Sequence, residues 1–225
     1  MNPANKLRIA AIVVAALTAV YALESFFSET FSLGQPALPR DPSKIVAQEI
    51  PAFARWAAAI SPIRADLDAN YAATVALMAV RPNNGVLSLS DSQKNADAQE
   101  DLTRVLRSAP HRSELWLLLA LLKTQHKSGN RPIIEALKMS YFTAPNDAQL
   151  MPLRLYTAVL SDALSDPDLK ELALGDVRLM LIRRADLKAS VLLAYKRGSS
   201  LGKAFLEEAA QSIDPQFLSV LRKGT

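Results

Sequence analysis

Two histidines are the first candidates for chemistry in this chain, since imidazole can bind metals or move protons near neutral pH. His111 follows Pro110 in an expected turn, and His126 stands beside Lys127 near the expected end of a helix. A metal site needs ligands four residues apart on a helix or gathered in a cluster. Neither histidine has such neighbours in sequence, and a charged imidazole at a helix C-terminus is favourable in itself. We therefore expect no metal site.

Acidic residues occur in three groups that could serve a hydrolase, which needs two carboxylates facing each other across a cleft. All three fall at polar positions of expected amphipathic helices, where a solvated face explains them: Asp66 and Asp68; Asp97, Glu100 and Asp101; Glu207 and Glu208. We therefore expect no catalytic centre and no cofactor, and we predict that the protein is not an enzyme.

Basic residues form a more informative pattern. Five of them lie near consecutive expected helix ends and could line one rim, where they would bind carboxylates of a partner protein or of an acidic polymer: Arg107, Arg112, Lys123, Lys127 and Arg131. The alternative is that Lys and Arg simply favour helix C-termini and solvated faces. A net charge of +4 is too small to predict nucleic acid as a partner.

An apolar run from Ile9 to Leu23, preceded by two basic residues, determines on which side of a membrane the rest of the chain lies. A cleaved signal peptide has an apolar core of about 7–15 residues, whereas a membrane-spanning helix needs about 20. An uncleaved anchor over residues 1–27, a cleaved signal and a merely buried helix all stay open. Because positive charge stays on the cytoplasmic side, the first two alternatives both export residues 30–225.

Composition predicts an all-α body. Half of the residues are hydrophobic but only 6% are aromatic, a balance that favours helices over strands. There are no cysteines, so no disulfide can stabilise the chain. Residues 28–41, which contain Gly34, Pro36 and Pro39, are expected to form a semi-extended linker.

Beyond the linker, residues 42–225 predict a succession of helices in one domain. A capping side chain followed by proline marks four helix starts, because proline's fixed φ suits the first helical position: Asp41-Pro42, Ser61-Pro62, Asp166-Pro167 and Asp214-Pro215. Helices are expected at 42–59 (broken near Pro51), 62–80, 93–107, 113–127, 132–143, 148–164, 167–183, 187–197, 200–211 and 215–223, with an irregular segment at 81–92. Short loops between helices make neighbours antiparallel, so we expect stacked helical hairpins.

The buried positions of two of these regions follow from spacing. In the helix expected at 62–80, a stripe repeats every three to four residues: Ile63, Leu67, Tyr71, Val75 and Met78. Residues 93–147 hold a weak internal repeat, in which Ser108-Ala109-Pro110 and Thr143-Ala144-Pro145 close two helices 35 residues apart. Its expected packing positions are Ala98, Leu102 and Val105; Trp116, Leu119 and Ala120; and Ile133, Leu137 and Ser140.

The order of large, small and turn residues in 93–147 resembles the tetratricopeptide repeat, whose period is about 34 residues. This sequence departs from the family at Lys123, where an aromatic residue is usual, and by one inserted residue near Gly129. The resemblance implies an α-solenoid whose concave surface holds a segment of a partner, with Lys123 among the lining positions. LWLLLALL and the later ALKMSYFTAPND also resemble, faintly, signal-anchored helical proteins of bacterial exopolysaccharide assembly.

These features together predict a single-pass protein of the bacterial inner membrane whose helical body lies in the periplasm and works as an adaptor or scaffold in envelope assembly. If the signal is cleaved, the body is instead soluble in the periplasm. The alternative function is a binding module for anionic polysaccharide, in its synthesis or export. Salt separates the two functions, because glycan binding through basic residues weakens steeply with ionic strength.

Overall fold

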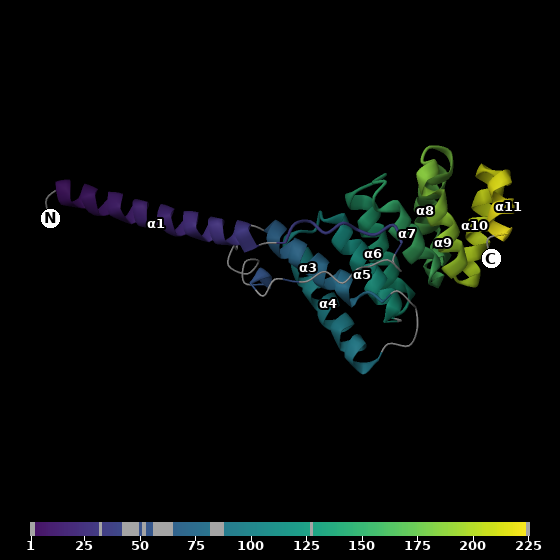
Figure 1. Cartoon of the computed structure of the whole chain (residues 1–225), viewed down its shortest axis with the longest axis horizontal. Helices are drawn as coiled ribbons and strands as arrows, with labels where there is room; N and C mark the ends of the chain where they lie inside the picture. The colour runs from purple at the N-terminus through teal and green to yellow at the C-terminus, as the bar shows by residue number, and fades with distance from the viewer. Residues whose placement is uncertain are drawn as a thin grey trace.

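The computed structural model describes residues 3–31, 33–41, 50, 53–55, 65–81, 88–126 and 128–223. Within these residues every regular element is a helix, so the predicted all-α class is confirmed for the described chain. One long helix carries the N-terminus away from a body of shorter helices, and the C-terminus lies at the opposite end of that body (Figure 1).

The long N-terminal helix, α1 (Pro3–Phe31), has an apolar stretch with no buried residue, and it is long enough to cross a membrane. It ends at Phe31, four residues beyond the predicted end at 27, so the start of the predicted linker is helical. The reason is that no helix breaker precedes Gly34. The Thr30 hydroxyl donates a hydrogen bond of 2.7 Å to the carbonyl of Phe26, as expected inside a helix.

The described body consists of short helices joined by tight turns. Their bounds are α3 (Ala65–Ala79), α4 (Leu89–Ser108), α5 (Ser113–Gln125), α6 (Asn130–Thr143), α7 (Met151–Val159), the 3-10 helix η2 (Asp162–Ser165), α8 (Pro167–Ile182), the 3-10 helix η3 (Ala185–Leu187), α9 (Lys188–Arg197), α10 (Ser200–Ile213) and α11 (Pro215–Lys223). The helices expected at 42–59 and the starts Asp41-Pro42 and Ser61-Pro62 fall wholly or partly outside the described residues.

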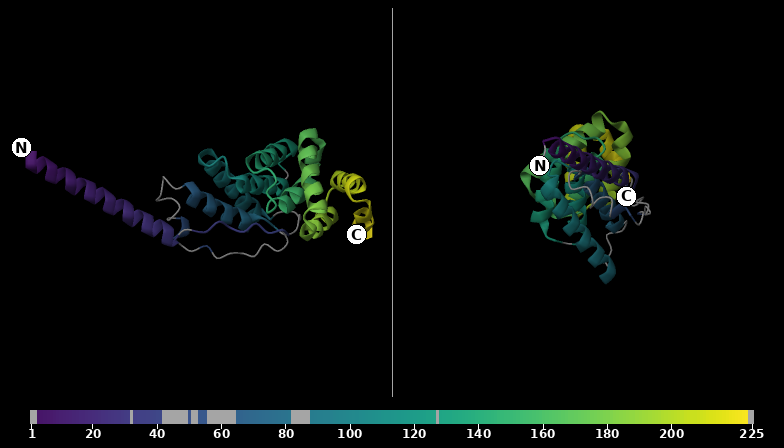
Figure 2. Two further views of the ribbon diagram at one scale, coloured as in Figure 1. Left: turned by 90° about the horizontal axis from the view of Figure 1, so that it is seen from above. Right: turned by 90° about the vertical axis from the view of Figure 1, so that its left-hand side faces the viewer.

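The body helices pack in two rows. We call α3, α5, α7 and α9 the odd layer, because each of these helices contacts the next one in the series. On the other side, α8 contacts both α6 and α10. Consecutive helices follow one another along the long axis of the molecule, so the body is built by successive addition rather than by long-range crossing (Figures 1 and 2).

Helix starts in the second half of the chain follow the capping rule. The Asp166 carboxylate accepts a hydrogen bond of 2.9 Å from the amide of Leu169, with Pro167 as the first residue of α8. The Asp214 carboxylate accepts one of 3.2 Å from the amide of Phe217 at the start of α11. Both predicted starts are therefore confirmed.

Other predicted boundaries were wrong by a few residues. The helix expected at 93–107 begins at Leu89, because Ser88 caps it by accepting a hydrogen bond from the amide of Asp91. The helix expected at 148–164 is shorter, since α7 ends at Val159 and η2 follows as a separate turn. The helix expected from Pro132 starts two residues earlier, at Asn130, after Gly129 with φ +84°.

The core is made mostly of alanine and leucine. Of the predicted stripe on α3, Leu67 is buried, Tyr71 and Val75 are only half-buried, Met78 is exposed, and Ile63 lies outside the described residues. Buried alanines occupy the rest of the core side of α3: Ala69, Ala72, Ala73 and Ala76. Small residues face the core because α3 packs closely against both α4 and α5. In the repeat region, eight of the nine expected packing positions are buried, and Trp116 is half-buried.

Candidate functional site

Residues 33–41, here called the strap, lead from the α1 side of the molecule toward α9 at the far end of the odd layer. The strap has no helix or strand, and it follows the body as an extended trace (Figures 1 and 2). Leu38 packs against the hydrophobic core, and Leu33, Pro36 and Pro39 are half-buried. The body thus already holds an extended segment on its surface.

The first contact of the strap is made by a side-chain amide of α3. Asn70 Nδ2 donates a hydrogen bond of 3.1 Å to the backbone carbonyl of Leu33. The other end of this amide, Asn70 Oδ1, accepts one of 2.9 Å from Arg112 Nη2. Arg112 is fixed in turn, since its Nε donates to Glu114 Oε1 in a largely buried ion pair. Arg112 and Glu114 therefore orient the Asn70 amide so that its NH2 group faces the strap.

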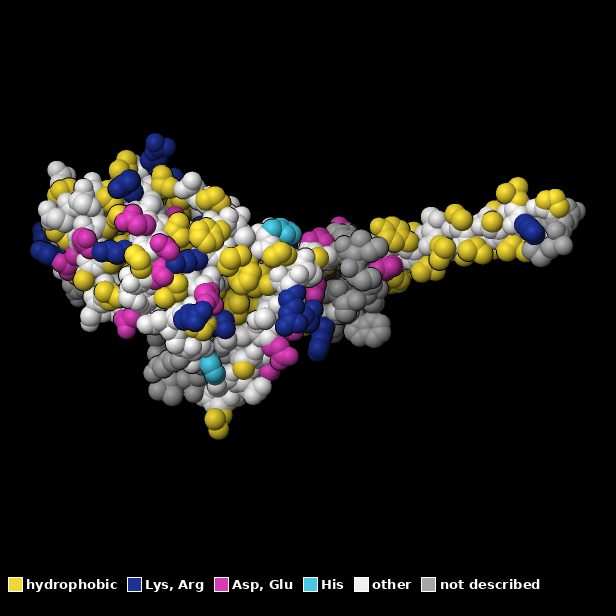
Figure 3. Space-filling view, turned by 180° about the vertical axis from the view of Figure 1, so that it is seen from behind, with side chains coloured by type: hydrophobic (Ala, Val, Ile, Leu, Met, Phe, Trp, Pro, Cys, Tyr) yellow, Lys and Arg dark blue, Asp and Glu magenta, His cyan; other side chains and the backbone are white. Residues whose placement is uncertain are grey.

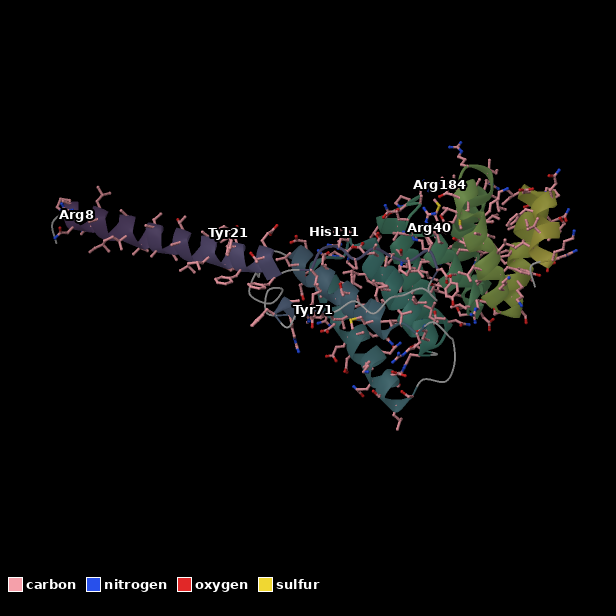
Figure 4. All side chains as sticks on the ribbon, viewed as in Figure 1. Arg8, Tyr21, Arg40, Tyr71, His111 and Arg184 are labelled. Atoms are coloured by element: carbon pink, nitrogen blue, oxygen red, sulfur yellow. The ribbon has the colours of Figure 1, made fainter. Side chains whose placement is uncertain are left out.

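The second contact is electrostatic and lies at the other end of the strap. Arg40 Nη1 is 3.3 Å from Asp186 Oδ2 in η3, and Arg184 binds the same carboxylate with two hydrogen bonds of 3.0 and 3.1 Å. Figure 4 shows Arg40 and Arg184 close together on the body. The Arg184 hydrogen bonds, with a smaller effect of Arg40, lower the pKa of Asp186, so this carboxylate stays ionised.

A shallow groove of about 390 Å³ continues from this ion pair along α9. The strap contributes two lining residues and the body the rest: Arg40, Asp41, Asp186, Ala189, Ser190, Leu192, Leu193 and Lys196. Asp41 lies near Tyr156 of α7, close enough for its negative charge to act on that residue. Burial is the main cause of the raised pKa of Tyr156, and the charge of Asp41 adds to the rise. The strap therefore extends from α3 past α7 to α9.

The contacts of the strap are weak ones. A single hydrogen bond such as Asn70 to Leu33 contributes about 1 kcal/mol, and an exposed ion pair about 0–1 kcal/mol. The Arg40 side chain is 56% exposed, so its pair with Asp186 belongs to the exposed class. Ordering a residue costs about 1–2 kcal/mol of backbone entropy, less where proline already restricts the chain. The hydrogen bond to Leu33 and the ion pair of Arg40 are therefore each weak, and Leu38 adds apolar contact with the core.

The structure places four of the five predicted partner-binding residues, and whether they form one rim stays a prediction. Arg112 points inward to Asn70 and Glu114, and Arg131 pairs with Glu135 at 2.9 Å. Arg107 is exposed near the end of α4, and Lys123 is half-buried in the last turn of α5. Lys127 lies outside the described residues. On the face shown in Figure 3, basic and acidic side chains are interspersed over the body, and apolar side chains are visible both on the body and along α1.

Sequence reasoning found Arg112 but missed its function, and it did not single out Asn70, Arg40 or Asp186. Asn70 sits in an alanine-rich helix where only tertiary contacts distinguish it. Arg40 stands in a segment that was predicted as a plain linker. A polar amide on the buried side of α3 is the signal that could have found Asn70, because mid-helix asparagine is unfavourable without a partner.

The residues considered for catalysis stay apart. His111 lies in the turn before α5, and His126 is the C-terminal cap of α5, as its position in the sequence predicted. In the described part of the chain, no three His, Asp or Glu side chains gather as a metal site would require. Of the acidic groups, Asp68 binds Arg104, and Glu207 binds Arg222 and the Tyr195 hydroxyl.

Residues 198–202, Gly-Ser-Ser-Leu-Gly, match the Gly-x-Ser-x-Gly spacing of a serine nucleophile. That spacing serves catalysis when it forms a sharp turn between a strand and a helix with a base nearby. Here it joins α9 to α10, and Ser200 is exposed at the first turn of α10. Ser199 caps α10 by accepting a hydrogen bond of 3.1 Å from the amide of Gly202. Capping and close packing therefore explain these residues.

A charged cluster is buried where α6, α7 and α8 meet. Arg154 is fully buried, and it donates to the carbonyls of Ser140 and Ala144, the latter at 3.0 Å. Its guanidinium lies 4.6 Å from the centre of the Tyr141 ring. Asp176 is 3% exposed, and burial raises its pKa to about 6 although the charge of Arg154 opposes the rise. Arg154 and Asp176 are thus buried in the core, and none of the strap contacts described above involves them.

Comparison with known proteins assigns no relative to this chain. No family model matches the sequence, and neither a curated protein nor a solved structure matches it.

Proposed function

We propose that this protein is a membrane-anchored adaptor whose helical body binds a partner protein in the cell envelope. The single observation that carries this proposal is the strap, an extended segment held on the odd layer through its backbone carbonyl and one ion pair. A surface that holds one extended segment through backbone and charge contacts is suited to hold another. The adaptor works by binding, without a catalytic step.

The anchor supports this proposal. The apolar side chains of α1 are exposed throughout its length, so they need a lipid environment or a partner helix to cover them. With the basic N-terminus in the cytoplasm of a bacterial cell, α1 would cross the inner membrane once and place the body in the periplasm. Anchoring confines the body to the membrane surface and raises its effective concentration near membrane proteins.

The arrangement of the helices supports a tetratricopeptide-like stack. The odd layer is continuous from α3 to α9, and α5 contacts both members of the preceding pair, α3 and α4. Eight of nine positions chosen from the repeat pattern are buried. Such a stack presents an elongated surface to one partner segment, which is the form of binding that an adaptor requires.

The alternative, a binding module for anionic polysaccharide, has less support. It depended on a rim of free cations, but the guanidinium of Arg112 is largely buried and bound to Asn70 and Glu114. On a surface where both signs of charge alternate, a polyanion meets repulsion as well as attraction.

Crosslinked affinity purification of the full-length protein from membranes, with intact-mass analysis of the bait, tests the proposal. We expect one or a few envelope proteins together with an uncleaved bait. A bait of residues 1–41 alone is the control for capture through the anchor. Recovery of carbohydrate without a protein partner, with a bait shortened near Ala22, would instead establish a soluble glycan-binding protein.

A further inference from the structure

The strap and the surface beneath it define what the partner segment looks like. We propose that the odd layer binds an extended, proline-containing segment of a partner protein with apolar residues two positions apart and a basic residue two positions later. The strap occupies this surface in the free protein and is displaced by the partner. This inference rests on the proposed adaptor function.

The first requirement is an extended backbone. Asn70 Nδ2 donates to the carbonyl of Leu33, so it recognises main chain rather than a side chain. Arg112 fixes the orientation of this amide through Asn70 Oδ1, and the Glu114 carboxylate fixes Arg112. The donor is therefore in place before a segment binds, and it can bind the backbone carbonyl of any residue at that position.

The second requirement is a pair of apolar residues two positions apart. Pro36 and Leu38 are half-buried, as is the adjacent Pro39, while Gln35 and Ala37 are exposed. Alternate residues of an extended chain point to one side, so positions 36 and 38 face the body together. Proline suits this segment because it restricts the chain beforehand and brings no amide hydrogen that needs a partner.

The third requirement is a cation that meets Asp186. Arg40 follows Leu38 by two residues and reaches this carboxylate at 3.3 Å. Arg184 binds the same carboxylate, which keeps it ionised and in position. A partner segment with Arg or Lys at the equivalent place would make the same contact, and one with an acidic residue there would be repelled.

Displacement of the strap changes how the anchor is tied to the body. The strap contains nine residues, which span about 30 Å when extended, at roughly 3.3–3.6 Å each. While the strap is bound, these residues run along the body. Once a partner segment replaces the strap, the same residues become a free linker between α1 and the body. Partner binding would therefore let the body move farther from the membrane surface.

The test measures binding of a fluorescent synthetic peptide with the sequence LGQPALPRD, residues 33–41, to full-length protein in detergent micelles. In the wild-type protein the strap competes as an intramolecular ligand, at an effective concentration on the order of 1 mM for a short flexible linker. Replacing residues 33–41 with a Gly-Ser sequence of equal length removes the competitor. We expect the peptide to bind this variant at least tenfold more tightly than it binds the wild type.

Two further variants identify the surface. In the Gly-Ser background, Asp186→Arg should weaken peptide binding at least tenfold, whereas the control Glu135→Arg on α6, outside the strap contacts, should leave it unchanged. Because the chain has no cysteine, Arg40→Cys and Asp186→Cys can be bridged specifically with a bismaleimide. The bridged protein should bind the peptide less tightly than the same double variant left unbridged, which controls for the loss of the Asp186 carboxylate.

Equal peptide affinity of the wild-type, Gly-Ser and bridged proteins would overturn the inference. The adaptor proposal is judged separately by partner capture from membranes. If the bridged protein still captures its partner, the adaptor stands and uses another surface, so the inference about the strap is wrong. If the Gly-Ser variant binds the peptide tightly and yet no protein is captured, the binding surface stands and the adaptor function fails.

Discussion

Neutralising the buried carboxylate of Asp176 should stabilise the protein at neutral pH. Burial raises the pKa of Asp176 in the folded state to about 6, compared with a reference value of 3.8. Between these two values the folded state holds the proton more strongly than the unfolded state does. The free energy of unfolding therefore falls as pH rises through this window, and the whole loss is present above pH 6. Asp176→Asn removes the ionisation and hence the loss.

The size of the effect follows from the difference between the two pKa values. A difference of about two units, at 1.36 kcal/mol per unit, corresponds to roughly 3 kcal/mol. We therefore expect the free energy of unfolding of Asp176→Asn to exceed that of the wild type by up to roughly 3 kcal/mol near pH 7.5. The advantage should shrink as pH falls and vanish near pH 4, where Asp176 is protonated in both states.

Urea denaturation of both proteins between about pH 4 and pH 8, followed by tryptophan fluorescence, measures this difference. Several other carboxylates have lowered pKa values and lose stabilising contacts in acid, but they are identical in the two proteins and cancel. Asp97→Asn on the exposed side of α4 controls for the substitution itself. If Asp176→Asn is less stable near pH 7.5, the attraction between Asp176 and Arg154 outweighs the cost of burial, and the reasoning is refuted.

Three further predictions concern single side chains, each measured as the change in free energy of urea unfolding. Trp116→Ala should cost roughly 2 kcal/mol, less than the 3–5 of a fully buried aromatic, because Trp116 is half-buried; no change would mean that its packing and its bond to Pro110 contribute nothing. Gly129→Val should cost on the order of 2 kcal/mol, since φ is +84° there. Gly202→Ala should be destabilising by roughly 1–3 kcal/mol, because a Cβ would lie 2.4 Å from a backbone oxygen; Gly175→Ala, with open space around it, should instead stabilise α8 by about 1 kcal/mol, and the same sign for both would contradict this reasoning.

Local rules predicted those parts of the fold that local interactions decide. Asp166 and Asp214 start helices because their side chains reach amides three residues ahead, whatever the rest of the chain does. The same capping rule did not predict Ser88 as a helix start. The residues after it are mostly polar, so no apolar repeat indicated that the helix already begins there. The prediction of the buried face of α3 was only partly right for a different reason. The helix buries mostly alanines, because its neighbours approach closely, and that approach depends on packing between helices rather than on local sequence.

The candidate site was less predictable, because its geometry comes from residues far apart in sequence. Leu33 meets Asn70, and Asn70 meets Arg112, so the site joins a linker, one helix and the turn before another. Charge counting identified Arg112 as a cation but not the direction in which it points. The ion pair of Arg40 with Asp186 bridges residues almost 150 positions apart, and no spacing rule reaches that distance.

Arg154 gives a physical reason for keeping a costly buried charge in this fold. The last carbonyls of a helix lack partners within it, and a cation near them is favourable. Arg154 of α7 donates to the carbonyls of Ser140 and Ala144 at the end of α6, and so fixes α7 relative to the preceding hairpin. The carbonyls that Arg154 reaches belong to the end of another helix, so its burial serves the packing of α7 against α6. The cost of burying the charge is thus offset by hydrogen bonds that join two neighbouring helices.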